Sequence, residues 1–444
     1  MTEKTAELNP TARELLNKIK AKTAKIGVIG LGYVGLPLAV EKAKAGYRVT
    51  GFDVQEKKVS MVNRGINYIG DVLDGDLKDV VESGHLRASS DYDEIGGLDA
   101  VAVCVPTPID RYKQPDLRYV ENSTREIAKR LHRGMLVVLE STTYPGTTEE
   151  VLKPILESTG LVCGEDFFLA YSPERVDPGN KVYKTKNTPK VVGGVTAACT
   201  KVAAELYRNV LQGEVFEVSS PKVAEMEKIY ENVFRHVNIA LANETAILCR
   251  RMGIDVWEVI EAAKTKPYGF MPFYPGPGIG GHCIPVDPYY LVWKAREYDY
   301  HTRFIELAGE INDYMPSYTV ERAAEILNSS GRPLKGAKVL ILGVTYKKDI
   351  DDMRETPVLK IIQLLEKNGA QVSYSDPYVP EFIHNEKTYK SEEINSEILR
   401  SSDIVIIATD HEKFDYELVY KYSPLILDAR NALKNIRDPR IFRL

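Results

Sequence analysis

The sequence predicts an α/β protein in which two doubly wound parallel-sheet domains are joined by a central α-helical domain. Near both ends of the chain, short apolar runs alternate with amphipathic stretches, which is typical of β–α–β units in a parallel sheet. Between residues 220 and 320 the strand patterns largely stop, and long helical stretches flank a glycine-rich loop. The length of 444 residues allows two or three domains of ordinary size.

The order of these patterns divides the chain into four segments. Residues 1–23 are polar and predict an N-terminal extension, 24–219 the first α/β domain, 220–320 the helical domain, and 321–444 a smaller second α/β domain. The expected strands are, in the first α/β domain, KIGVIG, YRVTGFDV, DAVAVCVP, GMLVVLES, DFFLAYSPE, KVVGG and EVFEVSS, and, in the second, KVLILGVTY, AQVSYSDPYV, DIVIIATD and PLILDAR.

The composition excludes several classes of protein. A formal net charge of −5 with 27% charged residues is ordinary for a globular protein and lacks the basic surplus of a nucleic-acid binder. The N-terminus has no apolar signal-peptide core, and no later run approaches the ~18–20 apolar residues of a membrane span. We therefore expect a cytoplasmic protein with no nucleic-acid or membrane partner.

The five cysteines are scattered, without a C-x-x-C pair or a nearby His cluster, so neither a disulfide framework nor a metal site is expected. Four are expected to be small buried hydrophobes: Cys104, Cys163, Cys199 and Cys249. Cys283 lies in a glycine-rich loop, where backbone amides can approach an oxyanion, and Asp287 follows four residues later. Cys283 is a candidate nucleophile, because a thiol that captures an aldehyde lets a cofactor oxidise an alcohol twice.

A dinucleotide fingerprint, G-x-G-x-x-G, follows the first strand and opens a helix. Gly30 permits a tight turn, Gly32 lets the backbone approach a pyrophosphate, and Gly35 permits close packing of the helix on the strand. Asp53 ends the next strand, where a carboxylate meets the ribose hydroxyls. This Rossmann pattern predicts a dinucleotide cofactor. The acid favours NAD over NADP, although two nearby lysines partly offset its repulsion of a 2′-phosphate.

A long helix is expected from Pro221 to Gly253. Lys228 and Asn232 are one turn apart on its polar face, so they are able to reach into the same cleft. At ~1.5 Å per residue the helix spans roughly 45–50 Å, more than one small domain requires. A shared dimer interface is therefore expected along it.

Seven motifs follow one another along the chain: GLGYVG, ESTTYPGTT, YSPERV, Lys228 with Asn232, GPGIGGHCIPVDPYYL, GVTYKKDIDDMRET and LDARN. In order and spacing they resemble the UDP-glucose and GDP-mannose dehydrogenase family, from about Lys25 to the C-terminus. The run GGHCIPVDPYYL resembles most the UDP-N-acetylglucosamine 6-dehydrogenases. The resemblance implies oxidation of the C6 alcohol of a UDP-sugar to a carboxylate with two NAD⁺, through a cysteine-bound intermediate.

The resemblance also implies roles for individual residues. Cys283 would be the nucleophile, and Lys228 and Asn232 would stabilise the developing oxyanion. Three further residues would position water and move protons: Asp287, Glu174 and Thr142. The implied order is alcohol to aldehyde by the first hydride transfer, thiohemiacetal to thioester by the second, and then hydrolysis by water.

Cofactor and substrate contacts are implied in the same way. Beside the three glycines, the residues expected near NAD are Tyr33, Val34, Asp53, Lys58, Thr107 and Thr142. Those expected near the UDP-sugar are Glu174, Arg175, Lys228, Asn232 and Gly280, with Lys347 and Arg430 near the diphosphate and uridine. The resemblance further implies a homodimer formed through the central helical domain.

Two departures from the UDP-glucose pattern bear on the sugar. Val286 stands where UDP-glucose members usually carry Lys, and Arg175-Val176-Asp177 replaces the usual Leu-Arg-Glu. Both resemble the N-acetylhexosamine branch, and we rank N-acetylglucosamine before N-acetylmannosamine and N-acetylgalactosamine. Two other hypotheses stay open: a cofactor-binding protein without catalysis, and a two-electron 3-hydroxyacid dehydrogenase, which leaves the thiol loop and the third domain unexplained.

Overall fold

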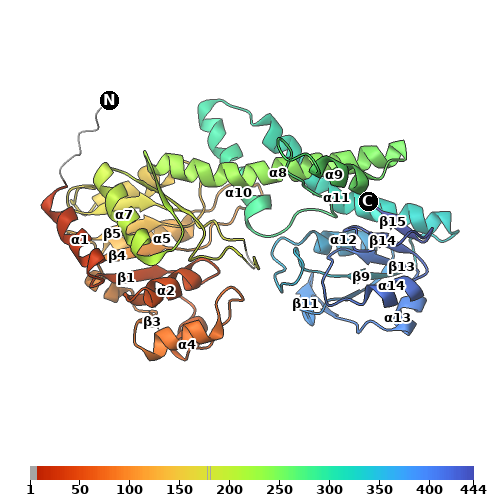
Figure 1. Ribbon diagram of the computed structural model, residues 1–444, viewed down its shortest axis with the longest axis horizontal. Coiled ribbons are helices and arrows are strands. Elements are labelled where there is room, and N and C mark those ends of the chain that lie inside the picture. The colour runs from red at the N-terminus through yellow and green to blue at the C-terminus, as the bar shows by residue number, and fades with distance from the viewer. Residues whose placement is uncertain (1–7, 178, 181) are drawn as a thin grey trace. The chain divides into compact units, whose positions relative to one another are not determined.

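The computed structural model describes residues 8–177, 179, 180 and 182–444. They form two compact units, of which the first contains the chain up to Glu231 and Tyr289–Asp299, and the second contains Asn232–Pro288 and Tyr300–Leu444. In Figure 1 the sheet of the first unit is drawn in red to yellow and that of the second in blue. The predicted class is confirmed, since two largely parallel sheets are separated in the chain by a helical segment.

The first unit is built on an eight-stranded sheet with the order β3-β2-β1-β4-β5-β6-β7-β8. Its strands are β1 (Lys25–Ile29), β2 (Arg48–Phe52), β3 (Leu86–Ser89), β4 (Ala100–Val103), β5 (Leu136–Leu139), β6 (Phe168–Tyr171), β7 (Lys190–Gly194) and β8 (Val215–Val218). The seven expected strands are present. The sequence analysis missed β3, because an exposed arginine interrupts its short apolar run. The sheet is also not wholly parallel, since β6 and β7 pair antiparallel.

Helices pack on this sheet, as α2 does on β1 and β2 and α7 on β7 and β8. The helices of the first unit are α1 (Pro10–Lys20), α2 (Gly35–Lys44), α3 (Glu56–Asn63), α4 (Asp74–Glu82), α5 (Arg118–Ala128), α6 (Lys153–Glu157) and α7 (Ala197–Val210). Strands such as β5 are buried along their whole length, as expected where helices cover a parallel sheet.

The N-terminal segment is integrated into the first unit from Asn9 onward. Its helix α1 buries Ala12, Leu15 and Ile19 in the core of the unit and packs against α7. Asn9 caps α1 by accepting from Ala12 N at 2.8 Å. The segment is polar overall, so the sequence analysis described it as an extension and did not recognise its amphipathic helix.

The helical segment contains α8 (Pro221–Met252), α9 (Val256–Lys264), α10 (Cys283–Ala295) and α11 (Arg303–Ser329). The predicted limits of α8 are confirmed, and Gly253, just after it, has a left-handed φ of 73°. Cys283 was expected in a loop, but it is the first residue of α10. The glycines before Cys283 and the two prolines after it do not predict a helix start. Pro285 lies in the first turn, where a proline loses no intrahelical hydrogen bond, whereas Pro288 lies inside the helix. No helix of the described residues is long and apolar enough to cross a membrane.

The second unit contains a parallel sheet with the order β10-β9-β13-β14-β15. Its strands are β9 (Lys338–Leu342), β10 (Gln371–Ser375), β13 (Ile404–Ile407), β14 (Ile426–Asp428) and β15 (Ile441–Arg443), and its helices are α12 (Pro357–Lys367), α13 (Ser396–Ser401) and α14 (Tyr416–Tyr422). The four expected strands are present. The sequence analysis missed β15 and the hairpin of β11 (Glu381–His384) and β12 (Lys387–Lys390), because each of these strands is only three or four residues long.

Candidate active site

The turn after β1 has the backbone that a dinucleotide requires. Gly30 has a left-handed φ of 91°, and a Cβ at Gly35 would lie 1.8 Å from the Gly30 carbonyl oxygen. A Cβ at Gly32 would meet no described heavy atom within 4 Å, so the turn is open on that side. Gly30 permits the tight turn, Gly35 the close packing of the helix, and Gly32 leaves the backbone amides exposed. Such a turn binds a pyrophosphate at the helix N-terminus.

Asp53, directly after β2, is tied to this turn. Its Oδ2 accepts from Leu31 N at 3.0 Å and from Lys58 Nζ at 3.3 Å, and its Oδ1 accepts from Gln55 N at 2.9 Å. The side chain is buried beside the glycine turn, where an acid binds the cofactor ribose. The ion pair with Lys58 offsets part of the carboxylate charge.

The other residues expected near the cofactor lie on the turn or after the first strands. Tyr33 is 40% exposed on the turn, and Val34 directly precedes α2. Thr107 follows β4 and is buried, and its carbonyl accepts a hydrogen bond from the Tyr290 hydroxyl of α10. Thr142 follows β5. Because carboxyl ends of parallel strands meet at one edge, these positions share the edge at which doubly wound sheets bind ligands.

Glu174, which follows β6, is held entirely by donors. Its Oε1 accepts from Arg175 N at 2.8 Å and from Val176 N at 3.0 Å, and its Oε2 lies 3.5 Å from Lys190 Nζ. A carboxylate surrounded by donors acts as an acceptor and is suited to orient water.

A buried charge cluster adjoins Glu174. Lys190 Nζ donates to Glu140 Oε2 at 2.6 Å, and the Tyr207 hydroxyl contacts the other oxygen of Glu140. The ammonium groups of Lys42 and Lys190 lie 5.4 and 5.3 Å from the centre of the Tyr207 ring. Burial lowers the pKa of Lys42. Burial also opposes the charge of Lys190, but Glu140 and Glu174 outweigh it and raise the Lys190 pKa.

Arg175, expected at the sugar, is fixed against α8. Its Nη1 donates to Pro189 O at 3.1 Å, and its guanidinium pairs with Glu231 and, at 3.3 Å, with Glu227. Burial, with the charge of Glu231, raises the pKa of Glu227 to about 7. Arg175 thus contacts the stretch of α8 that contains Lys228.

The candidate nucleophile begins α10. Cys283 is exposed, whereas the other four cysteines are buried, as expected. Asp287 lies one turn along α10, and its Oδ2 accepts from Asn232 Nδ2 at 2.6 Å. Asn232 and Asp287 are buried, and so is Lys228, one turn before Asn232 on α8. The second unit therefore brings thiol, carboxylate and amide together, with an ammonium group one helical turn from the amide.

The glycines of the cysteine segment (residues 276–282) are required by packing. A Cβ at Gly280 would lie 2.4 Å from Tyr346 Cβ and 2.8 Å from the Glu355 carbonyl oxygen. Both partners belong to the loop between β9 and α12. The sequence analysis assigned these glycines to the approach of amides to an oxyanion. Their partners show that they let the segment pack on the loop between β9 and α12, and their role toward an oxyanion stays a prediction.

The two residues expected at the diphosphate and uridine both follow strands of the second sheet. Lys347 follows β9, and its carbonyl accepts from Thr345 Oγ1 at 2.9 Å. Arg430 follows β14, donates from Nε to Ala408 O at 2.9 Å, and has its pKa lowered by burial. A Cβ at Gly276 would lie 2.6 Å from Arg430 Nη1, so the cysteine segment also contacts this arginine. Both cations lie at the edge where an open α/β sheet binds ligands.

Models of one protein family match three consecutive parts of the chain. They are the NAD binding domain of the UDP-glucose/GDP-mannose dehydrogenase family at residues 24–211, its central domain at 222–314, and its UDP binding domain at 340–435. The chain belongs to this family. The resemblance predicted from the motifs is confirmed, and so is the NAD cofactor.

Relatives of known name share most of the length of this dehydrogenase. It is 37% identical to the UDP-N-acetyl-D-mannosamine dehydrogenase of Pyrococcus horikoshii, over 94% of this chain and 98% of the relative. It is 39% identical to the UDP-N-acetyl-D-glucosamine 6-dehydrogenase of Pseudomonas aeruginosa, over 88% of this chain and 92% of the relative. The chain matches the solved structure of the UDP-D-ManNAc dehydrogenase from Pyrococcus horikoshii with a TM-score of 0.86 and 34% identity. The match covers 94% of this chain and 98% of that chain. The chain is an NAD-dependent UDP-sugar dehydrogenase.

Sequence reasoning missed several residues that shape this dehydrogenase site. Among them are Glu140, Lys190, Glu225, Tyr346 and His411, all held by contacts distant in sequence. One signal was available: Glu140 and Lys190 are charges at the ends of wholly buried strands, and such charges need a partner. Among the described residues, no group of three or more His, Cys, Asp or Glu side chains is arranged to hold a metal ion.

Proposed function

We propose that this dehydrogenase oxidises the C6 hydroxyl group of UDP-N-acetylglucosamine to a carboxylate in two steps of two electrons each. The observation that carries the proposal is the arrangement on α8 and α10. An exposed thiol begins α10, and one turn later a buried carboxylate is bonded to the amide of Asn232. The net reaction converts R–CH₂OH, water and two NAD⁺ into R–COO⁻, two NADH and three protons.

Cys283 acts as the nucleophile. The first turn of α10 directs its backbone amides and the positive end of the helix dipole toward an anion at this position, which favours the thiolate. The thiolate adds to the aldehyde carbon and forms a thiohemiacetal. NAD, when bound, accepts the hydride in each oxidation. Water then cleaves the C–S bond of the resulting thioester and releases the carboxylate and the thiol.

Lys228 and Asn232 stabilise the oxyanion at C6. One Nδ2 hydrogen of Asn232 is donated to Asp287, which fixes the amide and leaves a second hydrogen for the oxyanion. Lys228, one turn away and buried, supplies a positive charge where little water screens it. Asp287, with Glu174 and Thr142, positions the hydrolytic water and moves its protons.

The stoichiometry of NADH tests the covalent route. With a limiting amount of UDP-sugar we expect two NADH per sugar, and Cys283→Ala should lower kcat by at least about a thousandfold. Cys249→Ala, the same change at a buried thiol, is the control and should keep kcat within about threefold. A single NADH per sugar with full activity in Cys283→Ala would refute the thioester. Binding of NAD with no NADH from any UDP-sugar would favour the non-catalytic hypothesis.

The choice of sugar rests on two kinds of support. Val286, in place of the Lys usual in UDP-glucose members, is buried next to Asp287, and the Pseudomonas aeruginosa relative at 39% identity is named for N-acetylglucosamine. The second candidate is UDP-N-acetylmannosamine, which the name of the Pyrococcus horikoshii relative favours. The values of kcat/KM for UDP-N-acetylglucosamine, UDP-N-acetylmannosamine, UDP-N-acetylgalactosamine and UDP-glucose should fall in that order.

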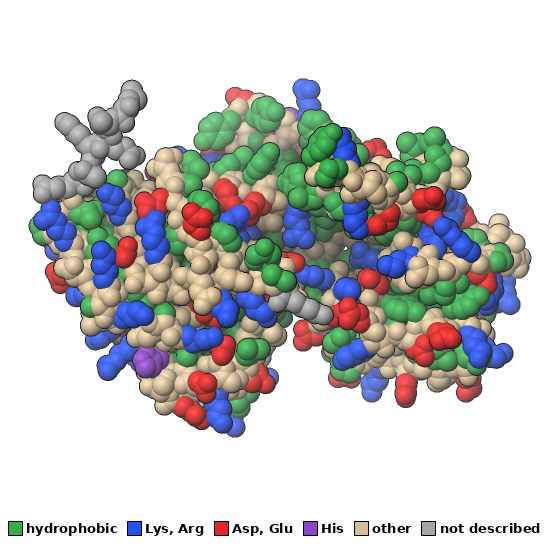
Figure 2. Space-filling model, in the orientation of Figure 1, with side chains coloured by type: hydrophobic (Ala, Val, Ile, Leu, Met, Phe, Trp, Pro, Cys, Tyr) green, Lys and Arg blue, Asp and Glu red, His purple; other side chains and the backbone are tan. Residues whose placement is uncertain are grey.

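We further propose that the dehydrogenase forms a homodimer along α8. Large hydrophobic side chains are exposed along this helix in two rows with seven-residue spacing, Val223 with Tyr230 and Phe234 with Leu241 and Leu248. Residues seven apart return to the same side of a helix, so each row is suited to pack against a second helix. Figure 2 shows hydrophobic side chains gathered on the surface of the central helices. A second copy of the chain presents the same rows and is the proposed partner.

A further inference from the structure

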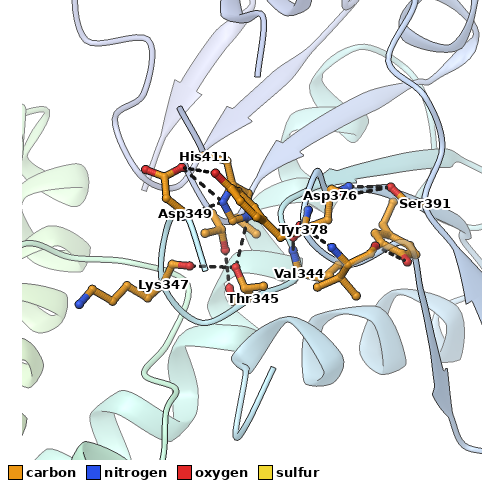
Figure 3. A network of polar contacts seen from close by, with 12 residues as sticks. Val344, Thr345, Lys347, Asp349, Asp376, Tyr378, Ser391 and His411 are labelled. Atoms are coloured by element: carbon orange, nitrogen blue, oxygen red, sulfur yellow. Dashed lines mark hydrogen bonds and ion pairs between the residues drawn. The ribbon is translucent and has the colours of Figure 1, made fainter. Parts of the chain in front are cut away.

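His411 lies fully buried at the centre of a polar network in the second unit (Figure 3). It follows β13, as Lys347 follows β9 and Arg430 follows β14. Its Nδ1 accepts from Asp349 N at 2.9 Å. Its Nε2 lies 3.1 Å from Asp376 Oδ2 and 3.2 Å from Thr345 Oγ1.

These partners select one form of the imidazole. The backbone N–H of Asp349 is only a donor, so the Nδ1 that it faces has no hydrogen. Neutral histidine then has its hydrogen on Nε2, which donates it to the Asp376 carboxylate. A doubly protonated ring would have to give up the bond from Asp349. The network is therefore complete only with neutral His411.

Asp376 anchors the network to the sheet. Its Oδ2 also accepts from Val344 N at 2.8 Å, and its Oδ1 accepts from Tyr378 N at 2.8 Å. Burial opposes ionisation of this carboxyl group, but the donors, His411 first among them, hold the Asp376 pKa below its usual value. His411 thus connects a fixed carboxylate at the end of β10 to the loop after β9.

That loop carries Lys347, a residue of the candidate site. Thr345 and Asp349, both bonded to His411, bracket Lys347, whose carbonyl accepts from Thr345 Oγ1. Asp349 has a left-handed φ of 60°, a conformation that a non-glycine residue keeps only when its surroundings hold it. In Figure 3 the Lys347 side chain extends away from the network, while its backbone belongs to it.

The same loop supports the cysteine segment. Tyr346, the neighbour of Lys347, is the residue that the Cα of Gly280 packs against, and Gly281 N donates to Arg354 O at 2.9 Å. A single loop therefore contacts His411 on one side and the residues that precede Cys283 on the other.

We infer that His411 is a positioning residue for the nucleotide end of the substrate: it fixes the loop so that Lys347 meets the diphosphate of UDP. The inference rests on the proposed function, which places UDP at this edge of the second sheet. His411 needs no contact with the ligand, because it acts through the backbone of the loop.

The test measures binding of UDP to the full-length protein by calorimetry, well below the melting temperature. His411→Phe keeps a ring between Tyr378 and Phe414 but removes the hydrogen bonds at both ring nitrogens, to Asp349, Asp376 and Thr345. The dissociation constant of UDP should rise about tenfold. The affinity for NAD should stay within twofold, because the change lies outside the unit that binds NAD, and the melting temperature of the variant should show that the second unit is folded. His384→Phe, the same change on the hairpin strand β11, is the control and should bind UDP like the wild type.

A double-mutant cycle tests whether His411 acts through Lys347. Lys347→Ala should weaken UDP binding, and adding His411→Phe to it should weaken binding no further. His411→Gln, whose carbonyl accepts and whose amide donates, should restore affinity to within about threefold. In turnover, His411→Phe should raise KM for the UDP-sugar by a larger factor than it lowers kcat, a split that general loss of structure would not produce.

Failure of the proposed function and failure of the role of His411 give different results. A wild-type protein that does not bind UDP would overturn the proposed function, whereas wild-type binding with an equal dissociation constant in His411→Phe would overturn only the role of His411. If His411→Phe does not fold, Thr345→Val provides the same test. It removes the hydroxyl that bonds the Lys347 carbonyl and should also raise the dissociation constant of UDP, and unchanged affinity would contradict the inference.

Discussion

A single buried carboxylate on α8, Glu225, holds the turn that follows β5 and Thr142. Its two oxygens accept from Gly146 N at 2.5 Å, Thr148 N at 2.8 Å and Thr148 Oγ1 at 2.7 Å. Burial raises its pKa to about 6, because the charged form loses solvation that these bonds only partly replace. The residue fixes a loop of the candidate site, and its raised pKa brings its titration toward neutral pH.

The stability of the protein should record this titration. The folded pKa of Glu225 lies above the ordinary value near 4.5, so its contribution is fully present below pH 4.5 and is lost as pH rises through about 6. Glu225→Gln does not titrate. The stability of the wild type relative to this variant, from urea denaturation, should fall by about 1 kcal/mol from pH 5 to pH 7.5. A difference that is constant or grows with pH would contradict this assignment.

At the scale of elements, the cysteine segment is positioned from both ends. Its glycines dock on the loop between β9 and α12, and the helix that it enters is tied to α8 by Asp287 and Asn232. A displacement of the segment would move the thiol, and reactions depend steeply on the placement of the reacting atoms.

Gly280→Ala tests this docking by steric overlap alone, because Gly280 does not have a positive φ. A methyl group there would lie 2.4 Å from Tyr346 Cβ, so the segment must shift, and kcat should fall by about a hundredfold. The control is Gly75→Ala in α4, where nothing lies within 4 Å of the new Cβ, and kcat should stay within twofold. Turnover with NADH detection decides the matter, and wild-type kcat in Gly280→Ala would show that the contact does not position the thiol.

At the scale of the whole molecule, α8 and α10 each contribute residues to both compact units. Long helices shared in this way connect the cofactor unit to the unit that contains the thiol. The exposed hydrophobic rows of the proposed dimer interface lie on α8, one of these shared helices.

Light scattering tests the proposed dimer. The wild type should have a mass near twice the 49.8 kDa of the chain, and Leu241→Glu should shift it toward the monomer at micromolar concentration, because the charge would be buried without a partner. Ile383→Glu changes a side chain that is 76% exposed on the β11–β12 hairpin and should leave the mass unchanged. A wild type that is monomeric at working concentration would refute the dimer.

The sequence by itself determined the elements with a local signal. The expected strands follow from runs of apolar residues, and the end of α8 follows from the glycine after it. The glycine turn with Asp53 follows from the small residues that a tight turn requires. The order of the motifs also determined the family and its NAD cofactor.

Only the tertiary structure decided how the site is supported. The bond from Asn232 to Asp287 joins residues 55 positions apart, and those from Glu225 to Thr148 and from Asp349 to His411 span 77 and 62. A glutamate in a helix or a histidine after a strand has the same local pattern whether it faces water or holds a loop. Its role is set by the partner that folding brings to it, because a buried polar group must be paired.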